Sequence, residues 1–153
     1  MAPSVMIDKH GPVWPLGNIV VASPGTPVSI MSLVDSTFRD APENPVGGST
    51  VSGGAVTGAE YTNRAQQIQF QGYKFPGGTG PAVVNTGLVY ILKKGGTGTV
   101  NRSDPGAVLW VLAPGQTWSL GSAALNRNVF NLYEFFIDAD NANDAAQVTA
   151  IIQ

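Results

Sequence analysis

Apolar and polar residues alternate along several short segments of the chain. In residues 65–72, an isoleucine and a phenylalanine alternate with three glutamines, and residues 86–94 place Leu88, Tyr90 and Leu92 on one side. Successive side chains of a β-strand point to opposite faces. This period of two therefore predicts strands in which one face is exposed to solvent and the other is buried.

The whole pattern predicts about eight strands separated by turn residues. Residues 107–113 are apolar on both faces, which predicts a central strand. Residues 128–139 have an apolar spacing that also suits a helix, but their aromatic and β-branched residues favour a strand. The predicted strands are residues 18–22, 26–34, 65–72, 86–94, 107–113, 117–122, 128–139 and 146–153.

Glycine and proline interrupt these strands often enough to exclude long helices. The chain of 153 residues has 19 glycines and 11 prolines, spread between short apolar segments. We expect an all-β fold, a β-sandwich or jelly roll, with residues 18–153 as a single domain. Residues 35–64, rich in glycine, proline and serine, predict a long surface loop or a projecting hairpin.

Residues 1–17 differ from the rest and predict an extended N-terminal arm. Their three prolines remove backbone donors, so we expect the arm to lie outside the sheets. The arm nevertheless carries large apolar side chains, which predicts contact with a partner; the alternative is that the arm folds back over its own domain. The residues predicted to bind the partner are Val5, Ile7, Val13, Trp14 and Leu16.

Charge and composition exclude several classes of partner. Charged residues make up 12% of the chain, the formal net charge is −2 and the basic residues are scattered, which argues against nucleic-acid binding. The longest apolar run is residues 107–113, far short of the roughly 20 residues that a membrane-spanning helix needs. The N-terminus lacks the pattern of a signal peptide. We expect a soluble chain that is not exported.

The segment "IDADNAND" near the C-terminus places Asp138, Asp140 and Asp144 at steps of two and four. An EF-hand calcium loop that began at Asp138 would need an oxygen ligand at position 5, glycine at 6 and glutamate at 12. This chain has alanine, asparagine and threonine there. Aspartate and asparagine also favour turns, because their side chains bond the neighbouring backbone. The sequence therefore predicts a turn without a metal.

Catalytic groups are few. The chain has no cysteine, and its one histidine, His10, lies in the arm. A glycosidase pair could use Glu134 and Asp138, but four residues along a strand separate them by about 13 Å, which suits neither glycosidase mechanism. We therefore predict that the chain is not an enzyme, that it has no catalytic residue and that it holds no cofactor.

Aromatic residues offer one alternative, a sugar-binding platform. Exposed tryptophan and tyrosine would support a carbohydrate-binding module, whereas buried ones would only fill the core of a β-sandwich. The second interpretation is favoured by the strand pattern around them. The residues concerned are Trp14, Trp110, Trp118, Tyr61, Tyr73, Tyr90 and Tyr133.

Several motifs in the chain match recurrent elements of small virion proteins. These are "SPGTPVSI" (23–30), "NTGLVYI" (85–91), "LAPGQTWSL" (112–120) and "NLYEFFIDADNANDAAQVTAII" (131–152). Together they resemble the capsid decoration, or cement, proteins of tailed phages over residues 18–34 and 65–153. The motifs are turns and core positions of strands.

The resemblance implies a β-sandwich on the outside of a phage head shell. It implies a homotrimer at local three-fold positions, with the major capsid protein or another virion protein as partner and with no catalytic residue or metal. The expected location is the virion, at the surface of the head. The alternatives are a component of a phage tail or fibre, or a carbohydrate-binding β module.

Overall fold

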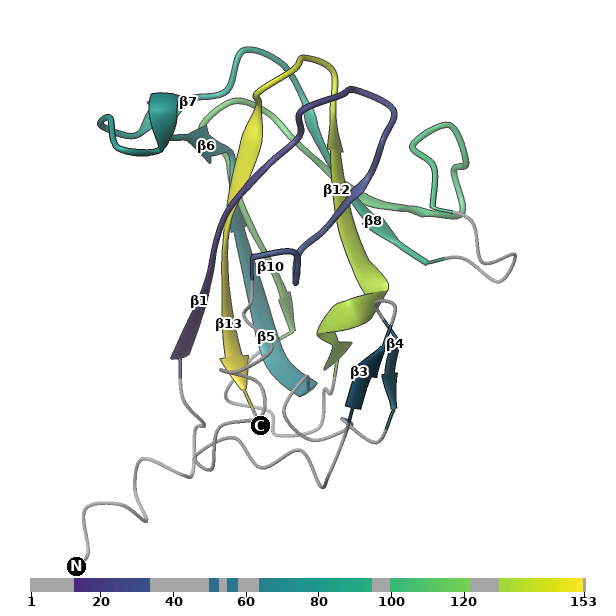
Figure 1. Ribbon diagram of the computed structural model, residues 1–153. Helices are drawn as coiled ribbons and strands as arrows, with labels where there is room; N and C mark the ends of the chain where they lie inside the picture. The colour runs from purple at the N-terminus through teal and green to yellow at the C-terminus, as the bar shows by residue number, and fades with distance from the viewer. Residues whose placement is uncertain are drawn as a thin grey trace, which may run out of the picture.

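The computed structural model of the protein describes residues 13–33, 50–52, 55–57, 64–94, 100–121 and 130–152 (Figure 1). These residues form antiparallel sheets joined by turns and by two short 3-10 segments. Within the described ranges the chain has no α-helix. The prediction of an all-β protein is confirmed.

The larger sheet has the strand order β1–β13–β5–β10, and β11 pairs with β5 beside β10. All of these pairs are antiparallel. β13 is the last of the described strands and lies between β1 and β5, so both its neighbours precede it in the sequence. The strands are β1 Val13–Val20, β5 Arg64–Gln71, β10 Thr117–Gly121, β11 Phe130–Asn131 and β13 Ala145–Ile152.

The smaller sheet has the order β2–β12–β8–β9, again with antiparallel pairs. Two hairpins, β3–β4 and β6–β7, stand apart from both sheets. The β3–β4 hairpin falls inside the predicted 35–64 loop and gives part of that segment a regular structure. The strands are β2 Val28–Ser29, β8 Val89–Lys93, β9 Val108–Leu112, β12 Phe135–Ala139, β3 Thr50–Ser52, β4 Ala55–Thr57, β6 Tyr73–Lys74 and β7 Val83–Val84.

One hydrophobic core joins the two sheets. The alternation in β5 buries Ile68 and Phe70 completely, while the glutamines between them remain partly exposed, as the sequence pattern predicts. The core residues come from both sheets, which is compatible with the predicted sandwich. They include Leu16, Ile19, Val21, Ile30, Ile68, Phe70, Val89, Ile91, Leu112, Leu132, Phe135, Ile137, Ala146, Val148 and Ala150.

The boundary of the predicted arm is wrong. Strand β1 begins at Val13 and pairs with β13, so residues 13–17 belong to the larger sheet. The sheet tolerates Pro15 because β1 is an edge strand of the described sheet and because the register shifts between Pro15 and Gly17. The shift leaves Leu16 outside the pairing, and its side chain is buried in the core.

Three predicted strands differ from the structure. The strand predicted for residues 26–34 is much shorter, because β2 covers only Val28–Ser29 and residues 30–33 form a turn. The prediction that residues 107–113 form a central strand is wrong, because β9 lies at the edge of the smaller sheet within the described residues. The segment 128–139 is interrupted by a 3-10 turn at Leu132–Glu134, which the Asn131 side chain caps by accepting from the Tyr133 N–H at 3.1 Å. Asparagine is a preferred residue for that role.

Candidate functional site

Of the three aspartates of "IDADNAND", Asp138 lies near the end of β12, whereas Asp140 and Asp144 lie on the turn between β12 and β13, at the upper end of the molecule in Figure 1. We call residues 138–144 the acidic turn. Asp138 and Asp144 are fully buried, whereas Asp140 is exposed. Asn143 has a φ of 67°, a left-handed conformation that asparagine tolerates better than most residues. The turn interpretation of this segment is therefore confirmed.

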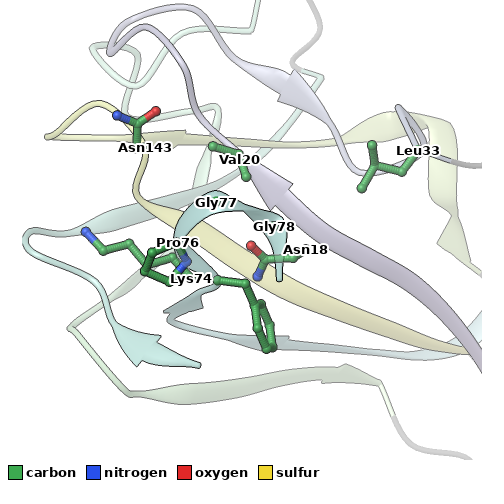
Figure 2. A pocket seen from close by; sticks show the side chains of 9 residues that line it. Asn18, Val20, Leu33, Lys74, Pro76, Gly77, Gly78 and Asn143 are labelled. Carbon is green, nitrogen blue, oxygen red and sulfur yellow. The ribbon is translucent and has the colours of Figure 1, made fainter. Parts of the chain in front are cut away.

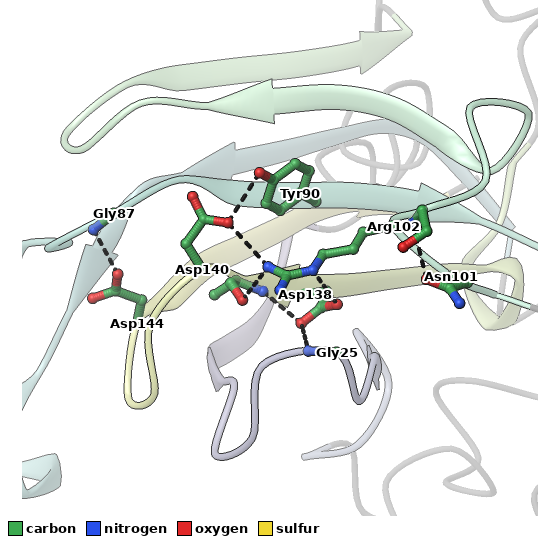
Figure 3. Close-up of polar contacts among 10 residues, drawn as sticks. Gly25, Gly87, Tyr90, Asn101, Arg102, Asp138, Asp140 and Asp144 are labelled. Carbon is green, nitrogen blue, oxygen red and sulfur yellow. Dashed lines mark hydrogen bonds and ion pairs between the residues drawn. The ribbon is translucent and has the colours of Figure 1, made fainter.

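The carboxylate of Asp144 is surrounded by three donors. The Lys74 ammonium donates to Oδ1 at 2.7 Å and forms an ion pair with it. The backbone N–H of Thr86 donates to Oδ1 at 2.9 Å, and that of Gly87 donates to Oδ2 at 2.7 Å (Figure 3). Beside it, the buried amide of Asn85 exchanges two hydrogen bonds, of 2.7 and 3.0 Å, with the backbone of the residue after Asp144. The turn is thus bound to both β6 and the β7–β8 connection.

These donors keep Asp144 ionised. Burial on its own raises the pKa of Asp144, because it disfavours the charged form. The hydrogen bonds from Lys74, Thr86 and Gly87 and the positive charge of Lys74 together outweigh burial, so the pKa lies below its ordinary value. The side chain is therefore a carboxylate at neutral pH.

Arg102, in the loop before β9, binds the other two carboxylates. Its Nη1 donates to Asp140 Oδ1 at 3.0 Å and to the Ala139 backbone oxygen at 2.8 Å. Its Nε lies 3.6 Å from Asp138 Oδ2, an ion pair beyond hydrogen-bond distance. The guanidinium carbon lies 5.5 Å from the centre of the Tyr90 ring, whose hydroxyl donates to Asp140 at 3.0 Å (Figure 3). Arg102 thereby covers the outer face of β12.

Asp138 also holds a loop from the other side. Its Oδ1 accepts from the Gly25 N–H at 2.9 Å and from the Ala139 N–H at 2.7 Å. Gly25 lies in the turn between β1 and β2, 113 residues away along the chain. The acidic turn consequently binds three connections of the protein and strand β6 at one end of the core.

A calcium ion has little room among these contacts. Each carboxylate has its own cationic or backbone partner, and the Arg102 guanidinium lies between Asp138 and Asp140 (Figure 3). In the ranges that the structure describes, no three histidine, cysteine, aspartate or glutamate side chains group in a way that could hold a metal. The absence of a bound metal remains a prediction for titration.

Catalysis by these carboxylates has no support in the geometry. Glu134 belongs to the 3-10 turn and pairs with Lys93 at 3.3 Å on the surface, whereas Asp138 is buried against Arg102. Lys74 and Asp144 could condense to an amide only if both were neutral, and the lowered pKa of Asp144 opposes this. The contacts of the acidic turn, which we call the clasp, hold separate segments of the fold together.

The aromatic residues divide between core and surface. Trp118 is partly buried and packs against the core, as does Tyr133, which confirms the prediction for both. The Trp118 ring stacks on Phe70 at 5.9 Å between centroids and on Trp110 at 5.4 Å, with an interplanar angle of 4° for the second pair. Trp110 itself is 41% exposed. Stacking on Trp118 occupies one face of the exposed ring.

Strand β9 presents an apolar strip to the surface. Leu109, Trp110 and Val111 are each between 37% and 41% exposed, and we call these three residues the β9 strip. Leu88, at the start of β8, is exposed to a similar degree. Trp110 and Val111 point to opposite faces of the sheet, since they pair with Ile91 and Tyr90 of β8, so the three residues mark an apolar sheet edge, and a bare edge can recruit another chain. The sequence pattern of residues 107–113 contains this signal, but burial in a central strand explains the same pattern equally well.

A pocket of about 810 Å³ lies between β1 and the 3-10 segment η1 (Pro76–Gly78) (Figure 2). Its wall is mainly apolar, with the amides of Asn18 and Asn143 among the lining residues. The Lys74 side chain, which also lines it, is engaged with Asp144. No charged group is therefore left to select a ligand among the residues that line this pocket.

The predicted partner-binding residues have different outcomes. Leu16 is buried in the core, so the prediction that it contacts a partner is wrong. Val13 is 62% exposed at the start of β1, and the backbone of Trp14 pairs with Ala150 in β13. Val5 and Ile7 lie outside the described residues. Contact of Val13, Trp14, Val5 and Ile7 with a partner remains a prediction.

The partners of the acidic turn escaped the sequence analysis. Lys74 lies in the short strand β6 and Arg102 in the loop before β9, 70 and 36 residues from Asp144 and Asp138. The available signal was that charged residues are rare, at 12% of the chain, so that each cation is a candidate partner for a buried carboxylate.

Comparison of the sequence with family models and with curated proteins, and of the fold with solved structures, found no match. Among the residues that the structure describes, no helix is long and apolar enough to cross a membrane.

Proposed function

We propose that this protein is a structural component of a phage virion that binds the outside of the head shell and stabilises it. The observation that carries the proposal is the β9 strip, an exposed apolar surface on a strand without a charged residue. Such a surface suits contact with another protein rather than with a small charged substrate. The identification of that protein as a virion component rests on the sequence resemblance.

The polar chemistry of the described residues is consistent with this role. The carboxylates of the acidic turn bind cations and backbone donors of the same chain. Such contacts make one end of the domain rigid, and rigid surfaces lose less entropy on docking. A jelly-roll arrangement of the two sheets is the finer fold that we propose for this role.

The proposed partner is the major capsid protein, or another virion protein that lies at the shell surface. We propose that copies of the chain associate with one another, and the resemblance predicts three copies at each local three-fold position. The N-terminal residues, with Val5 and Ile7, are the segment proposed to contact the shell. They precede β1, so their removal leaves every described strand intact.

Co-sedimentation with head shells tests the proposal. The shells are assembled from the major capsid protein of the same phage, and the protein is added in purified form. We expect the full chain to sediment with shells but not with unassembled subunits. A variant that lacks residues 1–12 should keep its melting temperature and lose the attachment.

The control is Asp140→Asn, which alters an exposed side chain far along the chain from the arm and should sediment like the wild type. Failure of the full chain to sediment with shells would contradict the proposed function. A fall of several degrees in the melting temperature of the truncated variant would instead show that the arm covers its own domain.

Carbohydrate binding is the second candidate, and the exposure of Trp110 is the observation that favours it. A sugar would have to stack on the ring face that Trp118 leaves open. Quenching of tryptophan fluorescence by soluble oligosaccharides, lost in Trp110→Ala, would support this candidate over a virion role.

A further inference from the structure

Most of the exposed large apolar residues belong to three neighbouring elements in the sequence. Six of the nine large apolar residues that are exposed belong to β7, to the start of β8 or to β9. Within the described residues β9 pairs with β8 alone, so its second edge has no strand beside it. The six residues are Val83, Val84, Leu88, Leu109, Trp110 and Val111.

The outer edge of β9 lacks the charged residues that usually protect the edge of a sheet. Proteins commonly place lysine or other charges on edge strands, because a bare edge recruits other chains. Residues 105–126, which include all of β9 and β10, contain no charged residue. A partner with a strong charge of either sign would find no counterpart here, whereas a second copy of this chain presents the same uncharged surface.

The central side chain of the β9 strip, Trp110, is also fixed by contacts within the same chain. The Trp110 ring lies nearly parallel to that of Trp118, and Trp118 stacks in turn on the fully buried Phe70. A side chain that is fixed in this way loses little entropy when it is covered. Tryptophan is also the residue type most enriched among the anchors of protein interfaces.

The order of residues in β9 makes the strip complementary to itself. Reversal of the strand about Trp110 places Leu109 opposite Val111, and these two apolar side chains are both exposed. A two-fold interface needs this property, because each residue meets the symmetry-related surface of an identical chain. We propose that the β9 strip packs against the β9 strip of a second copy, across a two-fold axis at Trp110.

The contact is made mainly by side chains. The register between β8 and β9 shifts so that Leu109 has no partner on β8, and a bulge of this kind twists an edge and interrupts a continuous ladder of hydrogen bonds. Stable complexes bury roughly 800 Å² on each partner, more than three side chains of the strip supply. We therefore expect weak association in dilute solution.

This inference rests on the proposed function, in which copies of the chain associate with one another, and it adds the surface through which they do so. A two-fold contact requires an even number of copies: two for a simple pair, or six if two of the predicted trimers meet. The tests below need no shells, so the failure of this inference is distinguishable from the failure of the proposed function.

The first test measures the number of chains in solution. Analytical ultracentrifugation of the full chain, at concentrations on the order of 0.1–1 mM, should show assemblies of an even number of 15.9 kDa chains. Val111→Glu places like charges on facing strips and should weaken the association roughly tenfold or more. Ser119→Glu introduces the same charge at an exposed position of β10 and should leave the association unchanged.

The second test uses the absence of native cysteines. Leu109→Cys and Val111→Cys proteins are mixed in equal amounts and oxidised gently. The proposed symmetry places residue 109 of one copy beside residue 111 of the other, so mixed disulfides should exceed the random share. Melting curves of each variant verify that it is folded.

The inference is overturned if the wild type remains a single chain or an assembly of three over the whole concentration range. It is also overturned if Val111→Glu and Ser119→Glu associate equally well, or if the two cysteine variants pair at random.

Discussion

Replacing Asp144 by asparagine removes a buried negative charge from among three donors. The asparagine oxygen can accept from one side, but its NH₂ group must then face a donor, either the Gly87 N–H or the Lys74 ammonium. Breaking a buried ion pair by loss of one partner costs about 3–5 kcal/mol. The Lys74 side chain is 20% exposed and can regain some hydration, so we expect about 3 kcal/mol.

Urea denaturation, followed by tryptophan fluorescence, measures this loss in the free energy of unfolding. In a domain of this size it corresponds to a fall in melting temperature of about 6–12 °C. The matched control is Asp140→Asn, whose side chain is 39% exposed, and for which we expect less than about 1 kcal/mol. Equal stability of Asp144→Asn and wild type would refute the view that the acidic turn clasps the domain.

The pH dependence gives an independent check on the same residue. Because the pKa of Asp144 is lower in the folded than in the unfolded chain, its stabilisation is fully present above the ordinary pKa of about 4. It is lost as the pH falls from there through the folded-state pKa. Below about pH 4, wild type should therefore lose unfolding free energy more steeply than Asp144→Asn. Parallel curves would show that the carboxylate is not preferentially ionised in the fold.

Three further outcomes are expected. Trp118→Ala should lower the free energy of unfolding, measured by urea denaturation, by about 2–3 kcal/mol. This is less than the roughly 3–5 kcal/mol of a fully buried tryptophan, because Trp118 is only partly buried. A variant as stable as wild type would mean that the packing of Trp118 does not stabilise the fold. Gly121→Ala should lower the free energy of unfolding by at least about 2 kcal/mol, since the φ of Gly121 is 81° and a Cβ would collide with the Gln66 carbonyl. An unchanged melting curve would contradict this expectation. Calcium or a chelator should leave the melting temperature unchanged, and a rise of many degrees with calcium would show a metal site.

Much of the strand pattern could be predicted from the sequence, because alternation reports which face of a strand is buried. Ile68 and Phe70 alternate with glutamines, and the structure buries the two apolar side chains of this pattern. The pattern says nothing about the position of a strand within a sheet. Residues 107–113 have the composition of a central strand and nevertheless lie at an edge.

The boundary of the arm could not be predicted from local rules. Three prolines argue against a sheet, yet Pro15 fits at the edge strand beside a bulge. The contacts of Asp144 could not be predicted either, because its partners lie 57 to 70 residues away along the chain and come close only in the complete fold. Its turn could be recognised because aspartate and asparagine act on their own backbone, which is a local effect.

The central position of β13 has a consequence for synthesis on the ribosome. Residues 145–152 are made after all the other described strands, yet they lie between β1 and β5 and pair with both. Until they emerge, β1 has no partner in the larger sheet, and β5 exposes an unpaired edge.

The larger sheet therefore cannot close before residues 145–152 have been synthesised. Long-range pairing of this kind slows folding and leaves strand edges open to aggregation in the meantime. A nascent chain stalled before residue 145 should remain sensitive to protease, whereas a chain whose residues 145–152 have left the ribosome should become resistant.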